Sequence, residues 1–101
     1  MVQIRGKNHV VLSRNVFRPE REGGLLVRFQ LSSNRQATVK VFDIAGRPVR
    51  TLADGEFFMA GWNELVWDGR NERRTLVGAG IYVVTVESGA VKEWRKVVVV
   101  R

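Results

Sequence analysis

Apolar and polar residues alternate along most of the chain, which is the pattern of half-buried β-strands. Between Leu25 and Leu31 every second residue is apolar, while Arg28 and Gln30 point to the opposite side. No stretch of ten or more residues carries an apolar stripe with the helical period of 3.6. The pattern therefore predicts an all-β protein in which helix is absent or trivial.

Turn-forming residues divide the chain into about seven short strands. Gly80–Glu87 is apolar on both faces, which predicts a central strand. Short strands at this spacing are typical of an Ig-like or fibronectin III-like β-sandwich with antiparallel strands. The predicted strands are His9–Ser13 with a kinked continuation to Pro19, Leu25–Leu31, Ala37–Asp43, Val49–Ala53, Trp62–Asp68, Gly80–Glu87 and Val91–Val100.

Four connections between these strands can be read from the sequence. Ile44–Pro48 is expected to be a hairpin, and Asp54-Gly55 to start a second turn. Phe57–Gly61 is predicted to be an apolar loop folded over one end of the sandwich. Gly69–Gly80, rich in glycine and polar residues, is predicted to be the one long loop.

The inward-facing positions of these strands define a candidate core. Tyr82 opens a late strand, where a tyrosine hydroxyl often bonds back across a corner of a sandwich. The predicted core residues are Phe29, Val39, Val41, Trp67, Tyr82 and Val84.

Length and composition restrict the class of protein. A chain of 101 residues is expected to form one domain, spanning residues 1–101, with a core that needs no metal or disulfide. It has no cysteine, which excludes disulfides, thiolate zinc sites and thiol catalysis. The loop carboxylates Glu20, Glu22 and Asp54 lack calcium-loop spacing. No cofactor or metal is predicted.

The net charge of +7 is spread along the chain. Only Arg70, Arg73 and Arg74 form a local cluster, which leaves a polyanion site as an alternative to a solvated loop. No motif for nucleic-acid recognition frames them, so a nucleic-acid partner is not expected. No apolar run approaches the roughly 20 residues needed to span a bilayer.

Four motifs, taken in order, carry a resemblance to a known family. Asn15–Pro19, Val41–Leu52, Ala60–Asn71 and Gly78–Tyr82 resemble the FlgD Ig-like domain, and the resemblance covers residues 15–101. Similar modules lie at the C-termini of secreted or surface bacterial proteins, including sorting domains of type IX secretion. The resemblance implies an extracellular or cell-surface location and a C-terminal place in a longer chain. It also implies protein partners, either domains of the parent protein or export and assembly machinery.

The polar residues at the ends of strands are best explained by turn structure. Asp43 and Asp68 each precede a glycine-containing turn, with Gly46 and Gly69 as the turn glycines. Catalysis is not expected, because the single histidine, His9, is far in sequence from both aspartates and no pair of carboxylates marks a cleft. The chain is therefore predicted not to be an enzyme.

Two groups of apolar residues are candidate contact sites. An exposed Trp62 or Trp94 could stack on sugar rings, which would make the domain a carbohydrate-binding module. Val97, Val98, Val99 and Val100 place apolar side chains on both faces of a strand, although a sandwich core needs only one. The outward pair either packs under His9–Leu12 or docks on a partner, by edge pairing or through its outer face.

The preferred interpretation is a non-catalytic accessory module of an exported bacterial protein. It would act in secretion or sorting, in surface attachment or in protein–protein assembly. Carbohydrate binding and polyanion binding remain the alternatives.

Overall fold

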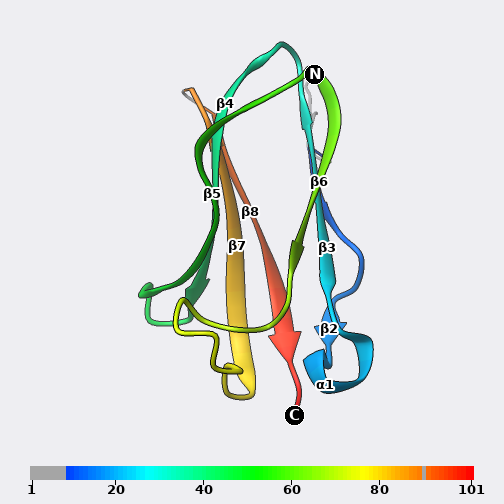
Figure 1. The fold of residues 1–101 in the computed structure, drawn as a ribbon, viewed down its shortest axis with the longest axis vertical. Helices are drawn as coiled ribbons and strands as arrows, with labels where there is room; N and C mark the ends of the chain where they lie inside the picture. Colours follow the sequence, from blue (N-terminus) through cyan, green and yellow to red (C-terminus); the bar gives the residue numbers. More distant parts are fainter. Residues whose placement is uncertain (1–8, 90) are drawn as a thin grey trace, which may run out of the picture.

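The computed structural model describes residues 9–89 and 91–101, and these form two β-sheets packed face to face (Figure 1). One sheet has three strands in the order β1-β3-β6, and the other has five in the order β2-β8-β7-β4-β5. The predicted all-β sandwich is confirmed, with eight strands in place of about seven. The elements are β1 (Val10–Leu12), β2 (Val16–Phe17), α1 (Pro19–Glu22), β3 (Leu25–Leu31), β4 (Arg35–Asp43), β5 (Pro48–Phe58), β6 (Gly61–Trp67), β7 (Gly80–Ser88) and β8 (Val91–Val99).

Strand β2 departs from the predicted antiparallel arrangement. It runs parallel to β8, with Val16 opposite Val98 and Phe17 opposite Val99. The chain changes sheets in the kink after β1, and the backbone N–H of Val98 then donates to the carbonyl oxygen of Asn15. The pairing is limited to two residues because Pro19 starts the single helical turn of α1 directly afterwards.

The turn predicted at Asp54-Gly55 is wrong, as is the apolar loop predicted at Phe57–Gly61. Strand β5 continues through Gly55 and Phe57 and ends at Phe58. Gly55 has a φ of +64°, and its N–H donates to the Thr38 hydroxyl at 2.9 Å. The register of β4 against β5 shifts beside this point, between Ala37 and Val39. A sequence that normally ends a strand therefore forms a β-bulge within one.

The hydrophobic core lies between the two sheets and is built around Trp67. The ring of Trp67 lies 5.9 Å from that of Phe17 and 5.7 Å from that of Tyr82, measured between ring centroids. Higher in the sandwich, Phe29 and Phe58 meet edge to face at 5.0 Å. All six residues expected in the core are buried, namely Phe29, Val39, Val41, Trp67, Tyr82 and Val84.

Strand β7 occupies the centre of the five-stranded sheet, between β8 and β4, as its two apolar faces indicate. Its inner face carries Tyr82, Val84 and Val86 into the core, and its outer face carries Ile81 and Val83. One side of β7 thus fills the sandwich, while the other contributes to the outer surface of the sheet.

Candidate functional site

The hairpin Ile44–Arg47, residues 68–79, α1 and the C-terminus gather at one end of the sandwich, which we call the lower end (Figure 1). The Asp43 carboxylate accepts hydrogen bonds from the backbone N–H of Ala45 and of Arg47, at 3.0 and 2.9 Å, and from Arg47 Nε at 3.0 Å. Gly46 closes the turn with a φ of +85°. These hydrogen bonds, led by that from the Arg47 backbone, hold the pKa of Asp43 below its usual value. Asp43 is engaged in holding this turn.

Asp68 organises the start of the long loop. Its Oδ1 accepts from the backbone N–H of Arg70 and from the guanidinium of Arg50 on β5, both at 3.0 Å. Gly69 has a φ of +79°, and a Cβ there would lie 2.6 Å from Pro19 Cγ. The loop, β5 and α1 are therefore fastened together at a point where only glycine fits.

Tyr82 and Trp67 tie the same loop to the core. The Tyr82 hydroxyl donates to the carbonyl oxygen of Gly78 at 2.8 Å, the corner contact expected from its position in the sequence. The indole N–H of Trp67 donates to the carbonyl oxygen of Arg70 at 3.0 Å. Burial and, to a smaller extent, the charge of Asp43 raise the pKa of Tyr82. Both polar groups serve the packing of the loop.

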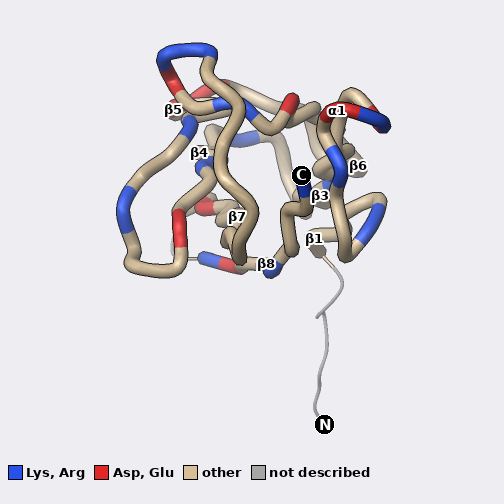
Figure 2. Tube along the Cα trace, turned by 90° about the horizontal axis from the view of Figure 1, so that it is seen from below, with Lys and Arg blue, Asp and Glu red and all other residues tan. Residues whose placement is uncertain are grey.

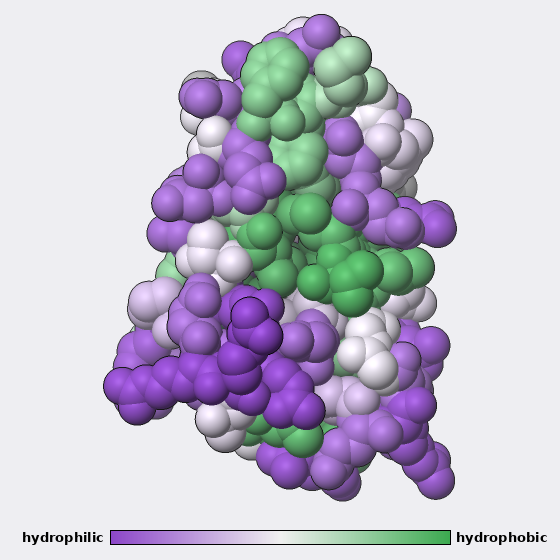
Figure 3. Space-filling view, viewed as in Figure 1, coloured by the Kyte–Doolittle hydropathy of each residue, from purple (hydrophilic) through white to green (hydrophobic). Residues whose placement is uncertain are grey.

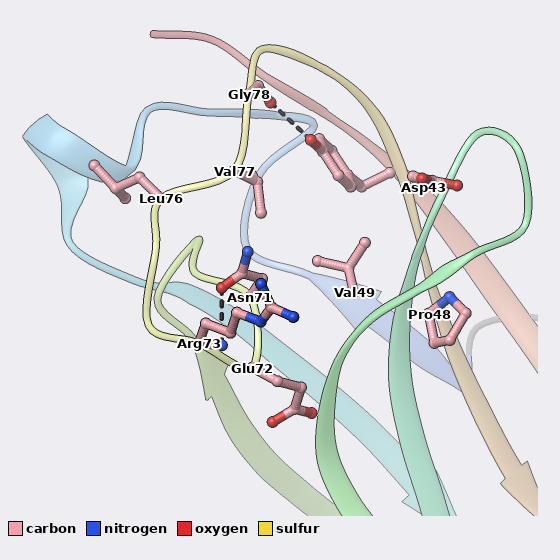
Figure 4. A pocket seen from close by; sticks show the side chains of 10 residues that line it. Asp43, Pro48, Val49, Asn71, Glu72, Arg73, Leu76, Val77 and Gly78 are labelled. Carbon is pink, nitrogen blue, oxygen red and sulfur yellow. Dashed lines mark hydrogen bonds between the residues drawn. The ribbon is translucent and has the colours of Figure 1, made fainter.

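A hollow of about 460 Å³ opens between this loop and the β4–β5 hairpin (Figure 4). Asp43, Asn71, Glu72, Arg73 and Tyr82 supply its polar lining. Besides Asp43 and Tyr82, whose hydrogen bonds are given above, two of these groups already accept hydrogen bonds: Asn71 Oδ1 accepts from the backbone N–H of Arg73, and the Glu72 carboxylate accepts from that of Thr51 at 2.5 Å. The hollow has no histidine and no paired free carboxylates, so its geometry does not form an acid–base site.

The three arginines of the candidate polyanion site lie on this loop but do not form one free cationic surface. Arg70 donates through its guanidinium to the carbonyl oxygen of Arg74 at 2.9 Å, and Arg74 has a φ of +68°. Acidic and basic residues intermix at the lower end of the molecule (Figure 2). Only Arg73 and Arg74 of the cluster offer guanidinium groups without a hydrogen bond among the described residues.

The other titratable residues considered above are dispersed. His9 Nδ1 lies 3.0 Å from a carboxylate oxygen of Glu93, and the His9 carbonyl accepts from the backbone N–H of Gln30. Glu20 and Glu22 are on α1, whereas Asp54 is on β5. Within residues 9–89 and 91–101, no group of three or more His, Asp or Glu side chains is arranged to hold a metal ion.

The two candidate sugar-stacking tryptophans lie on opposite outer faces. Trp62 is 54% exposed on the three-stranded sheet, at a hollow of about 520 Å³ that it shares with Val11, Arg28 and Glu64. Arg28 and Glu64 form an ion pair of 3.0 Å beside the indole. These two residues were not singled out from the sequence, although the outward position of Arg28 in its strand was visible there. Trp94 is 57% exposed on the five-stranded sheet.

Three of the four C-terminal valines lie on β8 and divide between its two faces, whereas Val100 follows the strand, is partly buried and donates its backbone N–H to the carbonyl oxygen of Phe17. Val97 and Val99 are buried in the core, whereas Val98 is 38% exposed on the outer face. Edge pairing by this part of the strand is wrong as a docking route, because β2 already occupies the edge at Val98 and Val99. The packing expected under His9–Leu12 is also wrong, since β1 pairs with β3 in the other sheet.

Val98 is instead the centre of an apolar row across three strands. Val16 on β2 and Ile81 on β7 lie directly opposite it on either side, and both are exposed, at 40% and 38%. On the neighbouring row Val83 lies opposite Phe42 of β4, and both are partly exposed. We call these five residues the outer-face patch. The sequence signals for it were the two apolar faces of β7 and Phe42, which interrupts the alternation of its strand.

The described part of the chain contains no helix with the length and hydropathy that a membrane crossing requires. No protein-family model matches the chain. No curated protein matches it significantly either.

Solved structures with the same fold include parts of three bacterial proteins. PorZ of Porphyromonas gingivalis, an essential bacterial surface component of the type IX secretion system, superposes with a TM-score of 0.65 at 21% identity, over 95% of this chain and 13% of PorZ. FlgD of P. aeruginosa gives a TM-score of 0.64 at 17% identity, over 86% of this chain and 69% of FlgD. Latent PorU of P. gingivalis gives 0.64 at 23% identity, over 90% of this chain and 9% of PorU.

These similarities confirm the FlgD-like fold that the sequence motifs indicated. The chain spans 13% of PorZ and 9% of PorU, so in both proteins the shared fold is a small part of a much longer chain.

Proposed function

We propose that this chain is a non-catalytic accessory module of an exported bacterial protein, through which that protein docks on its export or assembly machinery. The module would lie at the C-terminus of the longer chain and act outside the cytoplasm. The outer-face patch would be its contact surface.

The fold comparisons support the module part of the proposal. PorZ is a surface component of a secretion system, and the match covers only a small part of its chain. A rigid sandwich repeated in several larger proteins is suited to presenting a surface, because function is carried by sites placed on a fold. The lower-end polar groups of this chain hold turns and leave no catalytic arrangement, which favours a binding role.

The single observation that carries the docking role is the row formed by Val16, Val98 and Ile81. Three β-branched side chains from three strands lie in register on an outer sheet face, each at least 38% exposed. On a sheet face that is exposed to water, such positions are normally occupied by polar residues. Neighbouring exposed apolar residues are a mark of interaction surfaces. The strands beneath are held by the core, so the surface is preorganised.

An export assay tests the proposal. The chain is placed behind a periplasm-directed fluorescent reporter in P. gingivalis, and the reporter is measured at the cell surface and in the medium. We expect the fusion to reach the surface and Val98→Lys to reduce its surface fraction at least fivefold. Val91→Lys is the matched control, because Val91 is an exposed valine at the other end of β8. A reporter that stays in the periplasm, or equal effects of the two variants, would refute the proposal.

The hollow at Trp62 supports a second candidate function, the binding of a saccharide. An exposed indole beside an Arg–Glu pair offers an apolar face for a sugar ring and charged groups for its hydroxyls. Glycan-array binding should then be lost in Trp62→Ala and retained in Trp94→Ala, whose indole is similarly exposed. Equal binding by both variants would exclude Trp62 as the sugar platform.

A further inference from the structure

A sheet edge is a row of unpaired backbone N–H and C=O groups, and natural proteins usually protect such rows. The sandwich has four edges, formed by β1, β2, β5 and β6. Two of them are protected by their shortness, since β1 has three residues and β2 has two.

Strand β5 is long, but it is protected in other ways. It begins with Pro48, and three register shifts interrupt its pairing with β4. At its lower part, the loop residue Glu72 donates its N–H to the carbonyl oxygen of Val49 and accepts from the N–H of Thr51. Bulges, a proline and a covering loop are three known means of blocking an edge.

Strand β6 has none of these protections. It pairs with β3 over seven consecutive residues, from Gly61 to Trp67, without a register shift, and it contains no proline and no lysine. Within residues 9–89 and 91–101, no strand pairs with its other side. A strand of seven residues gives an edge of about 23 Å. Among the four edge strands, β6 is therefore the long one that is open for pairing. The part of β8 before Val98 also has no neighbouring strand on its β2 side, but it carries Lys92, Arg95 and Lys96, and basic side chains of this kind protect an edge.

The surface next to this edge is apolar. Leu52 and Phe58 of β5 and Leu65 of β6 pack only partly against the core, and Met59 and Val66 are exposed at 63% and 55%. Figure 3 shows this as a band of apolar surface between β5 and β6, above a strongly polar lower end. An added strand would cover this band with every second side chain.

The charges around the edge indicate the chemistry of the occupant. Residues 51–67 carry three carboxylates, those of Asp54, Glu56 and Glu64, and no lysine or arginine, in a chain whose net charge is +7. Glu64 lies on β6 itself and is paired with Arg28 of β3 at 3.0 Å, whereas Asp54 and Glu56 lie on β5, on the other side of the apolar band. The band is thus flanked by more acidic than basic groups in an otherwise basic protein. A segment with alternating apolar and basic residues complements it in both respects.

A second copy of this chain is a poorer fit for the same edge. Glu64 is the middle residue of β6, so full-length antiparallel pairing of two β6 strands would place Glu64 opposite its counterpart. Like charges directly opposite each other destabilise a strand pair. The remainder of a second copy is basic, but its basic strand β8 is already paired with β7.

We propose that the β6 edge binds an extended basic peptide segment by β-strand addition, with the segment's apolar residues covering the band between β5 and β6. Backbone hydrogen bonds supply the affinity of such a complex, and alternate side chains supply its specificity. This site is separate from the outer-face patch, which lies on the other sheet, and the proposal does not rest on the export role.

Two synthetic peptides test it, acetyl-(Lys-Val)4-amide and its glutamate counterpart acetyl-(Glu-Val)4-amide. Amide hydrogen exchange of the ¹⁵N-labelled chain is followed by NMR as each peptide is added. We expect the lysine peptide to slow exchange at least tenfold for alternate amides of β6 and to leave the β1 and β2 edges unchanged. Protection elsewhere, no protection, or equal protection by the glutamate peptide would overturn the proposal.

Charge-reversal variants provide the second arm. Asp54→Lys and Glu64→Lys should each weaken binding of the lysine peptide about tenfold. Glu87→Lys is the matched control, because the Glu87 side chain is similarly exposed, at 52% against 46% for Glu64, and lies on β7, which is next to neither β5 nor β6 in the strand order. Equal weakening by the control would reduce the effect to general charge attraction and refute a site at β6. A concentration-dependent dimer of the chain alone that protects β6 would identify a second copy as the occupant and also overturn it.

Discussion

The rings of Trp67 and Tyr82 lie 5.7 Å apart, centroid to centroid, at the lower end of the core. Trp67 belongs to β6 and Tyr82 to β7, so this contact joins the two sheets. Each residue also binds a carbonyl oxygen of the long loop, Trp67 that of Arg70 and Tyr82 that of Gly78. The pair therefore connects the core to residues 68–79, and the loop depends on the sandwich for its position.

Replacing Trp67 with alanine should be among the most destabilising substitutions in the chain. Trp67 is fully buried, so Trp67→Ala leaves a cavity between the sheets and should lower the free energy of unfolding by about 3–5 kcal/mol. Trp94→Ala, at a position 57% exposed, should cost less than about 1 kcal/mol. Urea titrations of both variants check the order, and a larger loss for Trp94→Ala would contradict this account of the core.

The turn at Asp43 should make part of the stability depend on pH. Hydrogen bonds from Arg47 and Ala45 lower the pKa of Asp43 in the folded state from its usual value of 3.8. The carboxylate therefore stabilises the fold fully above that value, and this contribution disappears as the pH falls below it. The difference in unfolding free energy between the wild-type chain and Asp43→Asn should thus shrink between about pH 6 and pH 2.

Asp54→Asn, measured in parallel, corrects for the general effect of losing one negative charge, because the Asp54 carboxylate is exposed on β5. A difference for Asp43→Asn that stays constant or grows on acidification would show that its carboxylate does not stabilise the turn.

The arginine cluster should bind polyanions only weakly. Arg70 is hydrogen-bonded within its own loop, and acidic residues intermix with basic ones at the lower end. Attraction of heparin or DNA to a dispersed basic surface is screened at physiological ionic strength. Binding should therefore be lost near 150 mM salt, a concentration at which the Debye length is about 8 Å. Retention there, with loss on replacing Arg70, Arg73 and Arg74 by alanine, would instead support a polyanion site.

The alternation of apolar and polar residues correctly predicted the strands of which one face is buried. The alternation of Leu25–Leu31 defines an inner and an outer side, and the structure buries the apolar side. Asp54-Gly55 misled the prediction because a glycine with positive φ serves a bulge as well as a turn. The parallel pairing of β2 with β8 joins residues about eighty positions apart, and two residues carry no period from which it could be read.

The candidate contact surface, too, could be predicted from the sequence only in part, because its residues come from distant segments of the chain. The sequence indicated that Val97–Val100 place side chains on both faces, but the faces could not be assigned without the register of β8 against β7. The partners of Val98 in the apolar row, Val16 and Ile81, come from distant parts of the chain. Only folding brings the three residues together.

Site-specific photocrosslinking in cells most directly tests whether the outer-face patch is a docking surface. The photoreactive residue p-benzoylphenylalanine replaces Val98 in one fusion and Val91, exposed on the same strand, in the other. The account predicts that position 98 forms a discrete crosslink to a cell-envelope protein of the export or assembly machinery, and that position 91 does not. Equal crosslinking from both positions, or none from position 98 while the fusion is exported, would contradict it.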